Sequence, residues 1–127
     1  MNLRRLDHLV VTARDPEATI RFYTEILGMR LVTFGEGRRA LAFGDQKINL
    51  HDAAKPYVPH ARRPEPGAVD ICLIAAEPVE QVMAELQAKG IKIEEGIVPK
   101  TGARAKLRSL YIRDPDGNLI EISNEVE

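Results

Sequence analysis

The chain has 127 residues, of which 44% are hydrophobic and 29% charged, as expected for one ordinary domain with a core. Its net charge of −1 lacks the basic excess of a duplex-binding protein, and the single cysteine, Cys72, excludes an internal disulfide and a cysteine-rich zinc site. No apolar run approaches the roughly 20 residues of a membrane span, and the first residues lack a signal-peptide pattern. We therefore expect a small, soluble, cytoplasmic domain that binds neither nucleic acid nor membrane.

The first elements are a strand in residues 6–13 and an amphipathic helix. Asp15 can cap this helix, and Pro16 suits its first position, where the missing N–H costs nothing. Gly28 supplies a left-handed stop. Between these ends, the apolar residues at helical spacing are Ile20, Tyr23, Ile26 and Leu27.

Three further strands are predicted in residues 31–37, 39–45 and 46–52. The following segment, 53–67, contains four prolines and is predicted to be a connecting loop that could also form one wall of a pocket.

An internal repeat shows that the second half follows the same plan. Shifting residues 6–31 by 62 positions places LDHLVVTA over AVDICLIA and aligns Gly28 with Gly90. The second helix is predicted to start at Pro78 and stop at Gly90, followed by strands in 91–97, 107–114 and 117–123. DPDG at 114–117 predicts a tight turn between the last two strands.

The resulting prediction is a single domain, 1–127, of the α+β class. It contains two βαβββ modules, about 4–52 and about 68–124, joined by the loop at about 53–67. With a helix on one face of each mixed sheet, the opposite faces would be concave and form an open cup.

Strand alternation places polar side chains on the face without helices. These residues are His8, Asn49, His51, Asp70 and Glu121. Two histidines and a carboxylate that converge in a cleft would make a divalent-metal site with positions open for substrate. The alternative is a set of isolated polar residues on a solvated sheet. His51 ends its strand and could lie at the surface, whereas Asp70 could be a fourth ligand or support one.

Other side chains have a functional and a structural interpretation. Tyr111 shares a strand face with Ser109, and it could bond substrate or be a half-buried strand aromatic. The basic stretch Arg104, Lys106 and Arg108 could position a carboxylate or phosphonate, but a solvated strand edge is the favoured interpretation. Arg38 and Arg39 are weaker candidates of the same kind, His60 is predicted at the surface, and Cys72 is predicted to be apolar filler.

LDHLVVTARDPEATIRFYTEILGMRL at the start and YIRDPDGNLIEIS at the end resemble the vicinal oxygen chelate superfamily, which includes glyoxalases, bleomycin-resistance proteins and extradiol dioxygenases. With KINLH in the fourth strand, the chain is most similar to small glyoxalase-domain proteins. The resemblance implies a metal chelated by vicinal substrate oxygens. His8 and Glu121 match family ligands, whereas Asp70 and Asn49 depart from the usual histidine and glutamate. His51 can substitute, which gives His8, His51 and Glu121 as the predicted ligands.

The implied function is a metal-dependent enzyme for a small oxygenated molecule, acting as a lyase, isomerase, transferase or dioxygenase with Fe, Ni, Zn, Mn or Mg. Glu121 or Asp70 would be the base in an isomerisation. The resemblance also implies a homodimer whose sites combine modules of two chains. The alternative is a metal-free protein that sequesters a drug or metabolite, although a chain without Trp and with 5% aromatic residues is poorly suited to stack planar drugs.

Overall fold

The computed structural model describes all 127 residues and divides them into two compact units, Met1–Ala68 and Val69–Glu127. Unit 1 contains β1 (His8–Ala13), α1 (Pro16–Arg21), a π-helical turn η1 (Phe22–Ile26), β2 (Arg30–Phe34), β3 (Arg38–Phe43) and β4 (Gln46–Asp52). Unit 2 contains β5 (Asp70–Ile74), α2 (Val79–Ala88), β6 (Glu95–Thr101), β7 (Lys106–Arg113) and β8 (Leu119–Val126).

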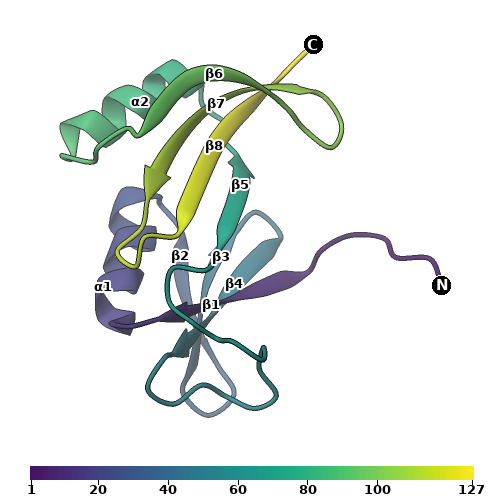
Figure 1. Cartoon of the computed structure of the whole chain (residues 1–127), viewed down its shortest axis with the longest axis vertical. Helices are drawn as coiled ribbons and strands as arrows, with labels where there is room; N and C mark the ends of the chain where they lie inside the picture. Colours follow the sequence, from purple (N-terminus) through teal and green to yellow (C-terminus); the bar gives the residue numbers. More distant parts are fainter. The chain divides into compact units, whose positions relative to one another are not determined.

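Each unit forms one four-stranded mixed sheet, and the two sheets have the same topology (Figure 1). The strand orders are β1-β4-β3-β2 and β5-β8-β7-β6. In each sheet the first strand pairs in parallel with the last, and the remaining neighbours are antiparallel. The predicted α+β class with two βαβββ modules is therefore confirmed. None of the helices has the length and apolar character needed to cross a membrane.

The first helix begins where predicted but changes form before its end. The Asp15 carboxylate accepts a hydrogen bond from the Ala18 N–H at 3.2 Å, and Gly28 has a φ of 72°. Instead of one α-helix to Leu27, the α-helical part ends at Arg21 and continues as η1. The Thr24 hydroxyl donates to the Ile20 carbonyl at 2.7 Å, a back-bond of the kind that disturbs a helix ladder.

Two predicted boundaries in unit 2 need correction. Pro78 is the N-cap of α2, so the helix itself begins at Val79. The Val79 N–H donates a hydrogen bond to the Asn124 side chain of the last strand at 2.6 Å. Strand β6 begins at Glu95 and not at residue 91. The reason is that the Ile91 N–H bonds the Leu86 carbonyl at 2.9 Å, so this residue closes the end of α2.

The strand register agrees with the predicted assignment of faces. In unit 1, Val11 pairs with Leu50 and both side chains are buried. In unit 2, Leu110 pairs with Ile122, and these side chains are also buried. The polar residues therefore occupy the opposite face of each sheet, where the site is to be sought.

Candidate functional site

Glu121 is the centre of a hydrogen-bonded cluster on β7 and β8 of unit 2. The Ser109 hydroxyl, fully buried, donates to the Glu121 Oε2 at 2.7 Å, and the Ser123 hydroxyl lies 3.3 Å from the same oxygen. The two hydroxyl oxygens are 2.7 Å apart. Because both serines approach Oε2, they fix the rotation of a half-buried carboxylate.

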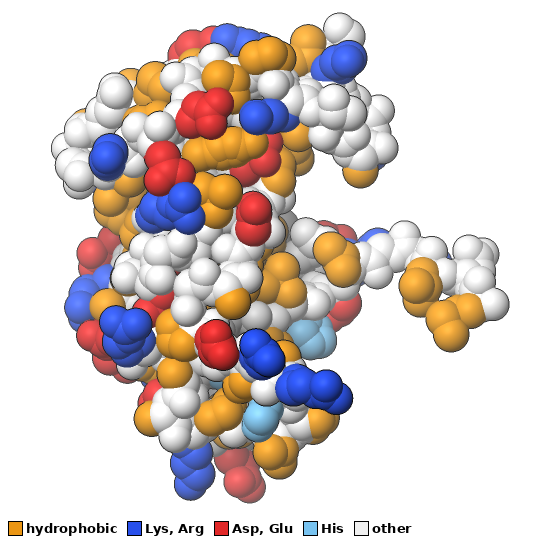
Figure 2. Space-filling view, in the orientation of Figure 1, with side chains coloured by type: hydrophobic (Ala, Val, Ile, Leu, Met, Phe, Trp, Pro, Cys, Tyr) orange, Lys and Arg blue, Asp and Glu red, His pale blue; other side chains and the backbone are white.

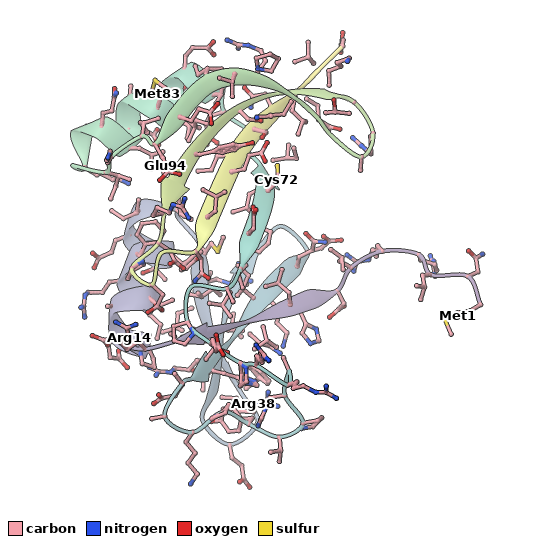
Figure 3. The ribbon with its side chains drawn as sticks, viewed as in Figure 1. Met1, Arg14, Arg38, Cys72, Met83 and Glu94 are labelled. Atoms are coloured by element: carbon pink, nitrogen blue, oxygen red, sulfur yellow. The ribbon has the colours of Figure 1, made fainter.

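Two further side chains extend this cluster. The Cys72 Sγ lies 3.4 Å from the Ser123 Oγ, and Cys72 is exposed on β5, so its prediction as apolar filler is wrong (Figure 3). Burial, a hydrogen bond with Glu121 and the charge of that carboxylate raise the pKa of Tyr111 to about 12. Tyr111 is therefore a neutral phenol at ordinary pH, on the face shared with Ser109 as predicted.

Glu121 differs in its partners from three surface glutamates of unit 2. Glu80, Glu94 and Glu125 each form an ion pair with an arginine. No lysine or arginine forms an ion pair with Glu121, and its oxygen is held by neutral hydroxyls. The carboxylate thus keeps its negative charge available for a cation. Two of the pairs use Arg104 and Arg108, in agreement with the solvated strand edge expected for that stretch.

His8, the predicted ligand of unit 1, is also oriented by a neighbour. Its Nδ1 lies 2.8 Å from the Asp7 Oδ2, and this hydrogen bond is the main reason why the pKa of Asp7 is lowered. A carboxylate only accepts, so Nδ1 carries the proton and Nε2 is the nitrogen left to bind a metal. Figure 2 shows histidine atoms at the surface of unit 1, where His8 and His60 are both exposed.

The strand register separates the two predicted histidine ligands. His8 pairs with Lys47 and Thr12 pairs with His51, so His8 and His51 are four residues apart along parallel strands, roughly 13 Å. Asn49 is only two residues beyond the His8 level, just as Glu121 is two residues beyond the level of Asp70. Within unit 1, the register therefore favours Asn49 over His51 as a group near His8.

His51 and Asn49 are buried in unit 1 instead of lining an open surface. Their exposed fractions are 2% and 6%, and both His51 ring nitrogens and the Asn49 Oδ1 have no hydrogen-bond partner. The Tyr57 ring contacts the imidazole edge-on, with centroids 5.5 Å apart. Burial and then the charge of Arg38 lower the pKa of His51, so its imidazole is neutral near pH 7.

These contacts show which residues can hold a metal. Within neither unit does a group of three or more His, Cys, Asp or Glu side chains come together as a metal site. His8 and Glu121 each have the supporting hydrogen bond that metal ligands usually make, with Asp7 and with Ser109. An imidazole and a carboxylate are each groups to which divalent ions bind. Asp70 is exposed on β5, two residues from the Glu121 level.

Sequence reasoning did not assign a role to Asp7, Ser123 or Tyr57. The Asp7–His8 dipeptide is the signal that could have indicated a carboxylate beside the ligand. Strand alternation puts Ser123 on the same face as Glu121, but nothing in its spacing indicates a bond to that carboxylate. Tyr57 lies in the proline-rich segment, and its contact with His51 depends on how that loop folds back on β4.

Comparison with known proteins gives a consistent picture. A family model described as the glyoxalase/bleomycin resistance protein/dioxygenase superfamily matches residues 5–122. Virulence protein STM3117 of Salmonella typhimurium is 52% identical over 126 residues, which cover 99% of this chain and 88% of that protein. Its crystal structure superposes with a TM-score of 0.97 over 99% of this chain and 100% of that one.

Two other relatives have more descriptive names. Glyoxalase domain-containing protein RDO1 of Mycosarcoma maydis is 48% identical over 124 residues, covering 98% of this chain and 70% of that protein. Glutathione transferase FosA of Serratia marcescens is 27% identical over 125 residues, covering 94% of this chain and 80% of that protein.

Proposed function

The chain belongs to the glyoxalase/bleomycin resistance protein/dioxygenase superfamily, and on this premise we propose that it is a metal-dependent enzyme acting on a small oxygenated molecule. His8 and Glu121 are the proposed ligands of one divalent ion, contributed by one chain or by two copies of it. Asp70 is the proposed further ligand, and His51, the predicted third ligand, lies four residues from the His8 level in the register of β1 and β4.

The observation that carries this proposal is the environment of the Glu121 carboxylate. It is half-buried, it has no cationic partner, and two serine hydroxyls hold one of its oxygens. Glu80, Glu94 and Glu125 of the same unit each pair with an arginine instead. The His8–Asp7 pair is the corresponding arrangement on the imidazole side.

The metal would supply Lewis-acid polarisation of the substrate oxygens, or oxygen activation if it is iron. The chain's own residues orient the ligands and the substrate. Tyr111, protonated at ordinary pH, would donate to a substrate oxygen by turning its single O–H away from Glu121. In an isomerisation the Glu121 carboxylate would act as the base.

Exposed apolar side chains support the expected homodimer. Leu3 and Leu6 of the N-terminal segment, which runs out from β1 in Figure 1, are 86% and 71% exposed, and Ile74 on β5 is 55% exposed. Such side chains are typical of surfaces that a second copy covers. We propose a cytoplasmic homodimer, which sedimentation velocity would show as a species of about twice the chain mass.

The proposal is tested by metal binding in matched variants. Wild type loaded with a divalent metal and desalted should retain about one ion per site by elemental analysis. Glu121→Gln should lose it, because the amide keeps the shape and removes the charge. Glu125→Gln is the control, since Glu125 lies on the same strand but pairs with Arg104. An empty wild type would contradict the proposal and favour a metal-free binding protein.

A further inference from the structure

Unpartnered buried polar atoms are concentrated on one face of unit 1. In the whole chain five buried side-chain nitrogen or oxygen atoms have no hydrogen-bond partner, and four of them belong to Arg38, Asn49 and His51. Burying such an atom without a partner costs about 1–3 kcal/mol, so native proteins leave few of them. These four atoms belong to neighbouring residues of β3 and β4. We call Arg38, Asn49 and His51 the Arg38 face.

The register explains why these residues are neighbours. Ala40 pairs with Asn49 and Arg39 pairs with Leu50, so the next step along the two strands brings Arg38 opposite His51. All three side chains of the Arg38 face therefore project from the same side of the sheet, away from the buried Leu50.

Arg38 also has no acidic partner. Arg39, the next residue, bonds Glu17 at 2.6 Å, but no aspartate or glutamate forms an ion pair with Arg38. Its guanidinium instead stacks over the rings of Phe34 and Tyr57, at 5.1 and 4.5 Å from their centroids. Figure 3 labels Arg38 where β3 passes the loop that follows β4. Two aromatic rings thus fix the plane of an unpaired cation.

We propose that the Arg38 face is a binding site for an oxyanion, the carboxylate or phosphonate-type group of the substrate. This deepens the proposed function, because it places an anionic group on the small oxygenated molecule. The Arg38 Nε–H is a buried donor, and a neutral imidazole presents one further N–H from His51. The remaining His51 nitrogen and the Asn49 Oδ1 are acceptors, suited to a hydroxyl or amine hydrogen beside the oxyanion.

Tyr57 covers this site. Its ring contacts both the His51 imidazole and the Arg38 guanidinium, while 40% of the residue is exposed to solvent. Because the polar atoms beneath are buried, an oxyanion reaches them only when this ring moves aside. The proline-rich loop predicted as a pocket wall therefore acts as the cover of the oxyanion site.

The test uses full-length, metal-free protein with labelled histidine rings, titrated with sodium acetate and separately with inorganic phosphate. Sodium chloride at matched ionic strength is the reference. We expect a saturable shift of the His51 ring signals, assigned with His51→Gln. Arg38→Met should weaken the binding roughly tenfold or more, because a hydrogen bond to a charged group is lost. Arg39→Met should bind as wild type does, because Arg39 pairs with Glu17.

The outcomes separate this proposal from the metal proposal. Tighter binding of acetate identifies a carboxylate, and tighter binding of phosphate identifies a tetrahedral oxyanion. A response no greater than that to chloride, or equal binding by wild type and Arg38→Met, overturns the oxyanion site. Arg38→Met should bind the metal as tightly as wild type does. If wild type binds the oxyanion but no metal, only the proposed function is contradicted. Arg38→Lys, which keeps the charge but lacks the guanidinium, guards against a folding defect in Arg38→Met.

Discussion

The two units share one topology but have different residues at four equivalent positions of their sheets. In unit 2, Ser109 pairs with Ser123 and Tyr111 with Glu121, and the side chains bond one another. The corresponding register positions of unit 1 are, in the same order, Arg38, His51, Ala40 and Asn49.

The difference between these sets is the presence of internal partners. Every polar group of the unit 2 set has a hydrogen bond within the set, whereas Arg38, His51 and Asn49 each have a buried atom without a partner. The unit 2 set is preorganised around one carboxylate, as a cation site requires. The unit 1 set is satisfied only by an external group. If both proposals hold, equivalent faces of one fold serve two kinds of chemistry.

The largest expected effect tests what the units have in common. Ile48 and Ile120 occupy equivalent positions on the helix-covered faces, and they are 1% and 0% exposed. Ile48→Ala and Ile120→Ala should each lower the free energy of unfolding by about 2–5 kcal/mol, because each leaves a cavity. Chemical denaturation measures this. A loss below about 1 kcal/mol in one variant alone would show that the two cores are not equivalent.

The next effect concerns the hydroxyl that holds Glu121. Ser109→Ala should reduce metal affinity about 10–100-fold, the usual result of removing the partner of a metal ligand. Isothermal titration calorimetry with the retained metal measures the change. Thr101→Ala, an exposed hydroxyl at the end of β6, is the control. Unchanged affinity in Ser109→Ala would mean that the serine cluster does not orient a ligand.

The smallest effect is a pH dependence of unit 2. The pKa of Tyr111 is about 12 in the folded chain and about 10 when unfolded, so folding retains its proton. The stability that this provides is complete below pH 10 and is lost as the pH rises towards 12. In metal-free protein, absorbance at alkaline pH should show a late tyrosine ionisation to which Tyr111 contributes. Tyr111→Phe should reduce that late step by one tyrosine, whereas Tyr57→Phe should leave it unchanged; the opposite pattern would refute the assignment.

The sequence was sufficient for the features that depend on local chemistry and periodicity. The Asp15 cap, the Gly28 stop and the alternation that separates Val11 from His8 all follow from neighbouring residues. The turn at 114–117 is confirmed in the same way, since Gly117 N–H bonds the Asp114 carbonyl.

Features that depend on pairing between distant residues could not be predicted from the sequence. The predicted start of β6 was wrong because the alternation in 91–97 resembles a strand. Ile91 instead bonds the end of α2 through its N–H. The weakness of His51 as a partner of His8 became visible only from the parallel register of β1 and β4. Arg38 was ranked low because its missing acidic partner and its two aromatic neighbours are properties of the folded unit.

In the proposed arrangement, His8 and Glu121 hold a divalent ion and His51 is left for the oxyanion. X-ray absorption spectroscopy of the metal-loaded protein distinguishes these roles, because outer-shell scattering reports the imidazoles bound to the ion. We predict imidazole scattering in wild type, the same scattering in His51→Gln, and no retained ion in Glu121→Gln. Loss of the imidazole signal in His51→Gln would show that His51 is a ligand and contradict this arrangement.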